Sequence, residues 1–246
     1  MVMIIGHRGA RELWPENSLR GFRETLALGI DGVEFDVHQT RDGGIVVIHD
    51  PTFERTARAA GPVGERTLAA ATAIELRDAG GERVPTLDQV LDIYQGSGLE
   101  LHIEIKTDAR GNAYPDFEQR LIDVVRRRRL AARTVLTCFA PEVLERARAI
   151  APDIRLLASF DRRSAELLGG IGRTLDRFLG IPGLLLAVEK SLLGLTLPLC
   201  LERAGGERLA AWVPNTPEDL AHWLAQPIRA ITTDRPDLAL KARAAS

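Results

Sequence analysis

Nine short apolar segments constrain the fold of this chain more than any other feature of its sequence. They are rich in β-branched residues and cover residues 2–7, 32–37, 45–49, 99–106, 134–139, 155–159, 184–190, 208–213 and 229–233. Most of the intervals between them carry helical patterns with clear start signals. Thr86 and Gln89 form a capping-box pattern, and Thr216 precedes a proline at the first helical position. Strands that alternate with helices predict an α/β fold built on a parallel sheet.

One interval is too short for a helix. Between residues 37 and 45 the chain has only a tight-turn sequence, Arg41-Asp42-Gly43-Gly44. Residues 45–49 are therefore predicted to fold back on residues 32–37 as an antiparallel hairpin. Eight strands joined by helical crossovers then remain, and eight is the strand number of a (β/α)8 TIM barrel.

The length of the chain sets the domain count. Its 246 residues fit one barrel domain as well as they fit two smaller domains, and the strand count favours a single domain over residues 1–246. Residues 51–85 follow the hairpin and are rich in Ala, Gly and Arg, with weak periodicity. They predict a small inserted lobe over the barrel mouth.

The charge balance argues against nucleic acid and membrane partners. The formal net charge is -2, and the basic run Arg126–Arg129 follows an amphipathic pattern typical of the solvated end of a helix. The apolar stretch 181–201 is interrupted by Glu189, Lys190 and Pro198, which argues against a membrane span. The two cysteines have no metal-site spacing and imply no disulfide. Because the chain opens without a secretory-signal pattern, we expect a cytoplasmic protein.

Ionisable residues cluster where the predicted strands end. The carboxyl ends of barrel strands meet at one mouth, and apolar segments that finish in charged groups are costly unless those groups meet a metal, a substrate or each other. Five segments have this form: His7-Arg8-Gly9, Glu34-Phe35-Asp36, His49-Asp50, Glu104-Ile105-Lys106 and Thr233-Asp234-Arg235. Together they predict a catalytic mouth.

Three carboxylates at this mouth predict a metal site. Side chains alternate along a strand, so Glu34 and Asp36 share one face, and the polar residues of 102–106 alternate in the same way, so that Glu104 is expected to converge with them inside the mouth. Like charges at close range raise one another's pKa unless a cation compensates them. Oxygen ligands alone favour Mg²⁺ or Ca²⁺, with Mn²⁺ as a further candidate. The alternative is a metal-free cluster paired with Arg8 and Lys106.

Two histidines and two cations complete the predicted chemistry. His7 and His49 suit an acid/base pair for displacement at phosphorus, because a histidine side chain ordinarily titrates near neutral pH. Arg8 and Lys106 supply positive charge where the nonbridging oxygens of a phosphodiester would lie. Asp50 either orients His49 or holds its loop.

The other three histidines receive different predictions. His38 is predicted to point away from Asp36, and His222 lies on a helix, so both are expected in packing or at the surface. His102 is predicted one inward layer below Glu104, where it would support that carboxylate.

The ordered motifs resemble one known family nearly from end to end, the glycerophosphodiester phosphodiesterases. The resemblance rests on the five segments above together with Pro15-Glu16-Asn17-Ser18, Thr40-x-Asp42-Gly43 and Pro236. It implies a TIM barrel that splits a glycerophosphodiester into sn-glycerol 3-phosphate and an alcohol. The attacking group in the family's attributed mechanism is the glycerol 2-hydroxyl, and water then opens a cyclic phosphate.

The same resemblance implies a role for each matching residue. Glu34, Asp36 and Glu104 would hold the divalent cation, and His7 with His49 would form the acid/base pair. Arg8 and Lys106 would contact the phosphate. Glu16 would lie near the metal or the substrate glycerol.

A few positions depart from the family pattern. Ser18 replaces a usual threonine, and Cys138 precedes Phe139 where serine is common. The family's Trp-Thr-Val-Asn run appears here as Trp212-Val213-Pro214-Asn215, so that a proline takes the place of its third residue. None of these affects the predicted metal ligands or histidines, so they bear on substrate choice. Three residues are expected to line the mouth and recognise the leaving alcohol, with packing as the alternative for each: Phe139, Glu189 and Trp212.

Two other functions remain open from the sequence. The same site could act on lysophospholipids as a lysophospholipase D, with Leu13-Trp14 and residues 171–186 forming an apolar groove. A catalytically inactive barrel that only binds phosphodiesters would be marked by loss of a histidine or a metal carboxylate, and none is missing.

Overall fold

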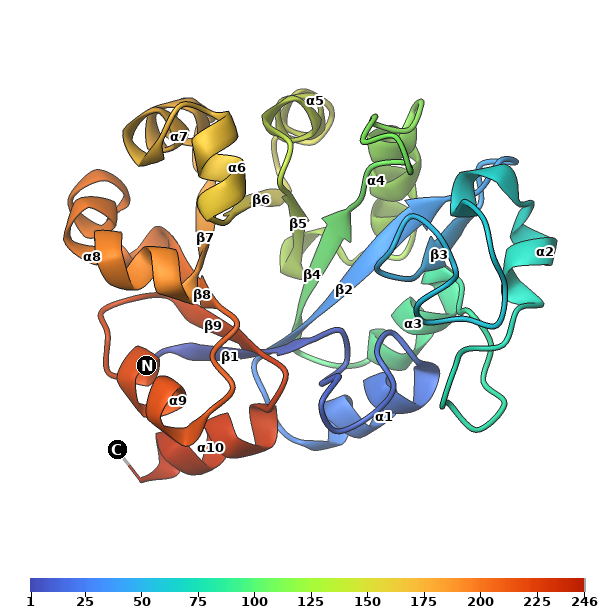
Figure 1. Cartoon of the computed structure of the whole chain (residues 1–246), viewed down its shortest axis with the longest axis horizontal. Coiled ribbons are helices and arrows are strands. Elements are labelled where there is room, and N and C mark those ends of the chain that lie inside the picture. Colours follow the sequence, from blue (N-terminus) through green and yellow to red (C-terminus); the bar gives the residue numbers. More distant parts are fainter. Residues whose placement is uncertain (246) are drawn as a thin grey trace.

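Eight parallel strands form a closed ring with the helices outside it (Figure 1). The computed structural model describes residues 1–245. The ring closes because β1 pairs with both β9 and β2. Its strands are β1 (Met3–His7), β2 (Gly32–Gln39), β4 (Glu100–Ile105), β5 (Thr134–Cys138), β6 (Arg155–Phe160), β7 (Leu185–Glu189), β8 (Leu209–Trp212) and β9 (Ala230–Thr233). The predicted (β/α)8 barrel is confirmed.

The surplus strand forms the predicted hairpin. β3 (Ile45–Val47) runs antiparallel to β2, with Val47 opposite Val37. In the turn, the Thr40 hydroxyl donates to Asp42 Oδ1 at 2.7 Å, and the Thr40 backbone N–H donates to the Gly44 carbonyl. Gly43 has a φ of 82°, a conformation in which a glycine carries no Cβ penalty.

The helices begin where the sequence signals predict. Thr86 Oγ1 accepts from the Gln89 amide while the Gln89 side chain accepts from the Thr86 amide, and Thr216 caps the helix that starts at Pro217. Ser18 caps the first helix by accepting from the Gly21 amide. The helices around the ring are α1 (Leu19–Ala27), α3 (Leu87–Tyr94), α4 (Phe117–Arg127), α5 (Pro141–Ile150), α6 (Arg162–Leu167), α7 (Ile171–Leu179), α8 (Lys190–Ala204), α9 (Pro217–Leu224) and α10 (Pro236–Ala244).

Alternation along the strands divides the barrel into two compartments. On β2, Val33 and Phe35 point outward into the large core between strands and helices, whereas Glu34 and Asp36 point into the ring. Inside the ring, a smaller apolar cluster fills the space below the carboxylates: Ile5, Val135, Leu157, Leu185, Ala187, Ala210 and Ala230. The barrel interior is therefore closed by packed apolar side chains between the polar groups at its mouth and a second polar cluster around Glu100 at the amino ends of the strands.

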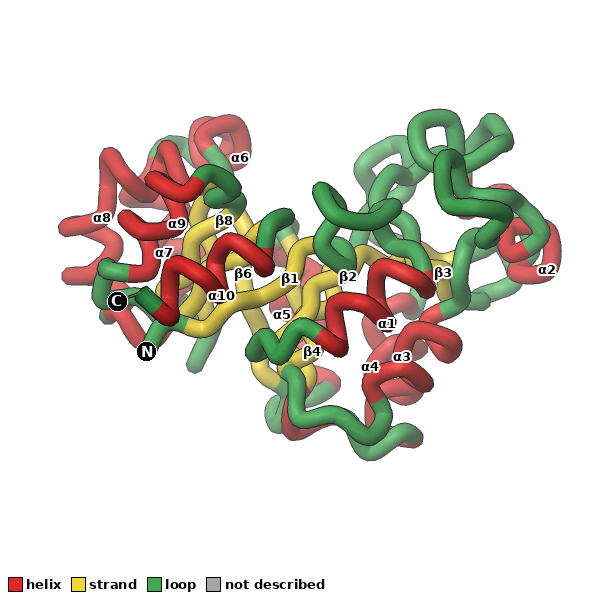
Figure 2. Tube along the Cα trace, turned by 90° about the horizontal axis from the view of Figure 1, so that it is seen from below, coloured by secondary structure: helices red, strands yellow, loops and turns green. Residues whose placement is uncertain are grey.

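Residues 51–85, called the lobe from here on, build a second core. The lobe contains a single turn of 3-10 helix (Val63–Glu65) and α2 (Leu68–Thr72). Its buried residues, among them Phe53, pack on Val46 and Ile48, whose side chains face away from the large core. Figure 2 shows the lobe at one end of the molecule, with α7, α8 and α9 at the other.

No helix in residues 1–245 combines the length and the apolar character needed to cross a membrane.

Candidate active site

A cavity of about 160 Å³ opens at the carboxyl ends of the strands. One side of it is charged and comes from β1, β2, β4 and the segment after β3: His7, Arg8, Glu34, His49, His102, Glu104 and Lys106. The other side is uncharged and comes from β5 to β9: Thr137, Phe139, Leu157, Ser159, Ala187, Trp212 and Thr232. The cavity therefore offers a polar wall and a neutral wall to whatever enters it.

The three predicted carboxylates meet at the charged wall. One carboxylate oxygen from each of Glu34, Asp36 and Glu104, called the acidic trio here, lies within 4.8 Å of the others, and all three side chains are buried. Burial, together with the charges of Asp36 and Glu104, raises the pKa of Glu34 well above its ordinary value. Burial also raises the pKa of Glu104. The three carboxylates therefore carry more negative charge than the surrounding side chains compensate.

Two cations supply part of the compensating positive charge. Lys106 Nζ donates to Glu104 Oε1 at 2.6 Å and lies 2.9 Å from Asp36 Oδ1, and Arg8 Nε lies 3.3 Å from Asp36 Oδ2. Burial opposes the charge on Lys106, but Asp36 and Glu104 outweigh it and raise the pKa of the ammonium. For Asp36, burial is outweighed by Lys106 and Arg8, which hold its pKa well below the ordinary value.

The acidic trio fits a hard divalent cation. Glu34 Oε1 is buried and accepts no hydrogen bond, and Asp36 Oδ1 has only the ion pair with Lys106. Buried carboxylate oxygens without partners are rare and costly. An all-carboxylate donor set is the kind that Mg²⁺, Ca²⁺ or Mn²⁺ takes.

His7 stands at one side of the trio. Its Nδ1 lies 2.6 Å from Asp234 Oδ1, and its Nε2 lies 3.8 Å from Glu34 Oε2. Burial would raise the pKa of Asp234, but hydrogen bonds from His7 and Arg11 hold it below the ordinary value. An ionised carboxylate can only accept, so His7 carries its proton on Nδ1. Burial lowers the pKa of His7 although Asp234 opposes this, and Nε2 is left as a free base.

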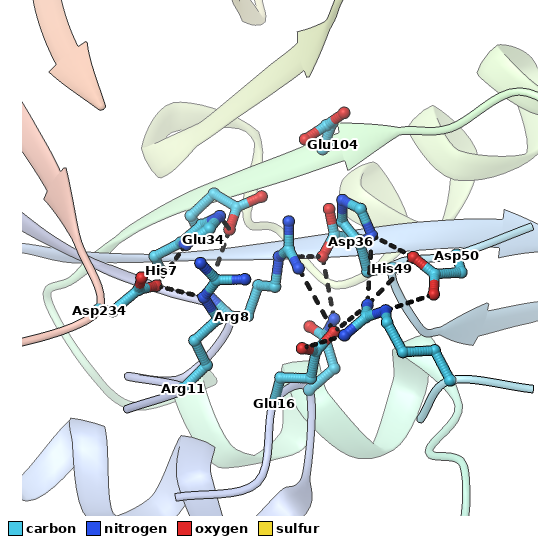
Figure 3. A network of polar contacts seen from close by, with 12 residues as sticks. His7, Arg8, Arg11, Glu16, Glu34, Asp36, His49, Asp50, Glu104 and Asp234 are labelled. Atoms are coloured by element: carbon cyan, nitrogen blue, oxygen red, sulfur yellow. Dashed lines mark hydrogen bonds and ion pairs between the residues drawn. The ribbon is translucent and has the colours of Figure 1, made fainter. Parts of the chain in front are cut away.

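His49 stands at the other side with a matching arrangement. Its Nδ1 lies 2.6 Å from Asp50 Oδ1, and Arg55 donates to both oxygens of that carboxylate. Burial lowers the pKa of His49 to about 4, with Asp36 opposing it. Figure 3 shows the two histidines on opposite sides of the carboxylates, each with its aspartate on the far side. Both imidazoles are therefore neutral at pH 7, with Nε2 unprotonated.

The prediction for His38 was wrong in its direction. Counting by two along β2 places His38 on the face of Asp36, and the side chain is fully buried. Its Nε2 lies 3.1 Å from the His49 carbonyl and its Nδ1 lies 2.9 Å from the Tyr114 hydroxyl. A carbonyl only accepts, so Nε2 donates to it and Nδ1 accepts from Tyr114. His38 thus anchors the backbone that carries His49.

A tight bend after β1 delivers Arg8. Arg8, Gly9 and Ala10 have φ values of 49°, 72° and 64°, all in the left-handed region. Two non-glycine residues there indicate stored backbone strain, which the Arg8 amide offsets in part by donating to Glu34 Oε2 at 3.2 Å. A Cβ at Gly9 would lie 3.1 Å from Phe22, so this position requires glycine.

The predicted substrate residues separate into two groups. Phe139 and Trp212 line the cavity and contact each other edge to face, with ring centroids 5.7 Å apart. Glu16 is outside the cavity lining and lines a separate depression next to Arg55, and both Arg8 and Arg55 bind its carboxylate. Glu189 lies apart from the cavity lining and caps α8, accepting from the Leu192 amide and the Ser191 hydroxyl.

Comparison with known proteins identifies the family. Residues 7–238 match the profile of the glycerophosphoryl diester phosphodiesterase family. The chain belongs to this family. A glycerophosphodiester phosphodiesterase of Caldanaerobacter subterraneus subsp. tengcongensis is 34% identical over 162 residues, which cover 63% of this chain and 65% of that protein. The chain thus spans slightly less than two thirds of the length of this curated relative. It spans 58% of the length of a second one, a glycerophosphodiester phosphodiesterase of Bacillus altitudinis.

Solved structures of the glycerophosphoryl diester phosphodiesterase family share the whole fold. A protein of Agrobacterium tumefaciens, provisionally assigned to this activity, is 28% identical, with a TM-score of 0.91 over 100% of this chain and 98% of that one. A phosphodiesterase of Oleispira antarctica has a TM-score of 0.83 and covers 98% of this chain and 96% of its own. At 21% identity, the second comparison supports the fold alone.

Some residues that contact the predicted site were not assigned a role by the sequence analysis. Asn17 donates to Asp36 Oδ2 at 2.9 Å, and Asp234 receives Asn215 Nδ2 at 2.7 Å as well as Arg11 Nε at 2.7 Å. Asn17 and Asp234 lie within the motifs Pro15-Glu16-Asn17-Ser18 and Thr233-Asp234-Arg235, and this membership was the signal that could have identified them as site residues. Arg55 lies in the weakly periodic lobe, where no local pattern marks it.

Proposed function

We propose that this protein is a metal-dependent phosphodiesterase that hydrolyses glycerophosphodiesters to sn-glycerol 3-phosphate and an alcohol. One observation carries the proposal: two imidazoles, each with Nδ1 bound to a carboxylate, lie on either side of a buried acidic trio in one cavity. Such pairs of bases beside a cation site suit proton transfer at phosphorus. Membership of the glycerophosphoryl diester phosphodiesterase family supports the same reaction.

The two histidines would divide the proton transfers between them. One would take the proton of the attacking glycerol hydroxyl at Nε2, and the other would deliver a proton from Nε2 to the leaving alkoxide. Both are neutral in the free protein because burial lowers their pKa values. A bound phosphodiester brings negative charge next to both rings and raises their pKa values, which lets one ring hold the proton that the acid needs.

The cationic residues would bind the phosphate, since Arg8 and Lys106 both face the cavity with charged donors. Glu16 would lie close to the glycerol. A divalent cation held by Glu34, Asp36 and Glu104 would polarise a phosphoryl oxygen and acidify the attacking hydroxyl.

The neutral wall would receive the leaving alcohol. Phe139 and Trp212 offer aromatic faces there, and we propose that they contact the alcohol. Glu189 was predicted to share this role, but its carboxylate is engaged in capping α8. The Oleispira antarctica phosphodiesterase is described in complex with the product sn-glycerol-3-phosphate, which is the product proposed for this chain.

Neither alternative gains a specific observation. Leu13 and Trp14 line a separate depression with Arg11, Glu12 and other charged residues, and none of residues 171–186 lines the cavity. An apolar groove for a lysophospholipid is thus not formed by the predicted segments. A binding-only barrel is also disfavoured, because both histidines and the whole acidic trio are in place.

Release of glycerol 3-phosphate tests the proposal directly. The substrates are glycerophosphocholine and glycerophosphoethanolamine, assayed with EDTA and then with Mg²⁺, Ca²⁺ or Mn²⁺ restored. We expect EDTA to stop the release and one of the ions to restore it. Release that persists in EDTA would refute the metal requirement. If no ion gave release but lysophosphatidylcholine were cleaved, the soluble-substrate proposal would be replaced by the lysophospholipase D alternative.

A further inference from the structure

One arginine of the lobe connects two separate parts of the barrel mouth. Arg55 Nη1 and Nη2 donate to the two carboxylate oxygens of Glu16 at 2.7 and 2.8 Å. Its Nε donates to Asp50 Oδ2 at 2.5 Å, and its Nη2 also lies 3.0 Å from Asp50 Oδ1. The planar guanidinium therefore binds two carboxylates, each in bidentate geometry, which is an arrangement that lysine cannot reproduce.

The Asp50 carboxylate is the closer link between Arg55 and His49, since Arg55 Nη2 itself lies 3.5 Å from His49 Nδ1. Asp50 Oδ1 accepts from His49 Nδ1 at 2.6 Å. The Asp50 side chain is about a quarter exposed, and within residues 1–245 its carboxylate pairs with Arg55 and His49 alone. Without Arg55, this carboxylate would be free to rotate towards solvent. His49 Nδ1 would then lose the acceptor that fixes both its tautomer and the direction of its ring.

The carboxylate that pairs with His7 is held in place differently from the one that pairs with His49. Asp234 is completely buried and is held by Arg11 Nε and by Asn215 Nδ2, while its own amide donates to Asn215 Oδ1. The His7 partner thus has several supports from the barrel itself. Asp50, the partner of His49, is held in place by one side chain of the lobe, Arg55. Within residues 1–245 no other side chain apart from His49 itself would hold Asp50 if Arg55 were removed.

We propose that Arg55 is a positioning residue of this site: it acts through Asp50 to hold His49 with Nε2 facing the cavity. The kinetic consequence rests on the proposed phosphodiesterase activity. The structural consequence, a fixed His49 tautomer, does not depend on that activity. No residue of the lobe lines the cavity, and Arg55 is the lobe side chain that binds Asp50.

Kinetics on matched variants tests the route through Asp50. We expect Arg55→Ala to lower kcat about 10- to 100-fold and to leave KM within about 3-fold, because such supporting partners act on the chemical step. Arg55→Lys should recover only part of the loss. Arg58→Ala is the control, because Arg58 is an exposed lobe arginine that pairs with Glu75. It should leave kcat within about 2-fold of the unaltered protein.

A double-mutant cycle separates this route from a direct effect of the charge. If Arg55 acts through Asp50, Arg55→Ala should cost little in a protein that already carries Asp50→Asn. Multiplicative losses in the double variant would overturn the proposal. An unchanged kcat in Arg55→Ala would overturn it as well.

A measurement without substrate keeps the inference separate from the proposed reaction. In protein labelled with ¹⁵N-histidine, we expect His49 to show protonated Nδ1 and bare Nε2, and to lose this single tautomer in Arg55→Ala but not in Arg58→Ala. If glycerol 3-phosphate release failed altogether, the proposed function would fall while this readout still decided the role of Arg55. Identical His49 signals in Arg55→Ala and the unaltered protein would refute the positioning role.

Discussion

A neutral imidazole can carry its proton on either nitrogen, so His7 and His49 are defined by what lies at Nδ1. In both cases it is an aspartate kept ionised by an arginine. The pKa of Asp50 falls to about 2, because hydrogen bonds from Arg55 and His49 outweigh the effect of burial. The two histidines have the same chemistry at Nε2 although His7 ends β1 and His49 lies in the segment after β3.

Removing either imidazole should stop turnover without unfolding the protein. We expect His7→Ala and His49→Ala each to reduce glycerol 3-phosphate release by about 10²- to 10⁴-fold, the usual contribution of a positioned acid or base. Circular dichroism would confirm that the fold is retained. Near-normal rates in either variant would contradict the acid/base assignment.

Removing one carboxylate of the acidic trio should remove the metal. We expect Glu34→Ala to lose both divalent-ion binding, measured by calorimetry, and activity, because Asp36 and Glu104 alone offer too few ligands. Glu75→Ala is the control, since Glu75 is an exposed carboxylate of the lobe. Unaltered ion affinity in Glu34→Ala would rule out the trio as the binding site.

At the scale of elements, period-two alternation decided most of what the sequence could predict. The nine predicted strands are all present, and the inward positions of Glu34, Asp36 and Glu104 were assigned correctly, whereas His38 on β2 was assigned to the wrong face. The strand ends shifted by one or two residues, since β2 runs on to Gln39 and β3 stops at Val47. The role of Arg55 could not be predicted, because its partner Glu16 lies far away along the chain and local periodicity does not encode such contacts.

The amino ends of three strands are joined by one carboxylate. Glu100 at the start of β4 accepts from Arg155 at the start of β6, from Arg229 just before β9 at 2.7 Å, and from His102 at 3.2 Å. Burial would raise the pKa of Glu100, but the hydrogen bonds from His102 and Arg155 dominate and lower it to about 2 from 4.5. In a TIM barrel this end of the strands serves stability.

That carboxylate should make stability depend on pH in acid. A depressed pKa contributes stability above pH 4.5, and the contribution disappears as the pH falls towards about 2. We expect Glu100→Gln to lower the free energy of unfolding by roughly 2 kcal/mol at pH 7, after allowance for the half-exposed arginines, with the difference vanishing in strong acid. Urea titrations at pH 7 and pH 3 would show this. A difference that stayed constant with pH would contradict it, and Glu145→Gln on the surface is the control.

At the scale of the whole molecule, two hydrophobic cores share one strand. Ile45 and Val47 of β3 pack into the large core, whereas Val46 and Ile48 pack into the core of the lobe. We propose that the lobe is an insertion within one barrel domain, held to it by this strand and by the contacts of Arg55. Its small core makes it the part expected to open first.

A cavity in the lobe core should open the lobe and leave the barrel folded. Phe53 is fully buried there, and Phe53→Ala is expected to destabilise the lobe by roughly 3 kcal/mol. Hydrogen exchange should then show lost protection in residues 51–85 and retained protection in β4 to β9. Activity should fall as in Arg55→Ala. Uniform loss of protection would instead show that lobe and barrel unfold together, as expected for Phe178→Ala in the large core.

The uncharged wall of the cavity has a consequence for evolvability. Thr137, Ser159, Ala187 and Thr232 come from four different strands of the barrel and make none of the contacts that hold the acidic trio or the two imidazoles. Selection can therefore exchange these side chains one strand at a time while the proton donors and the ion site stay as they are. On the proposed function, new alcohol preferences would arise by single substitutions that leave the bond-breaking apparatus unchanged.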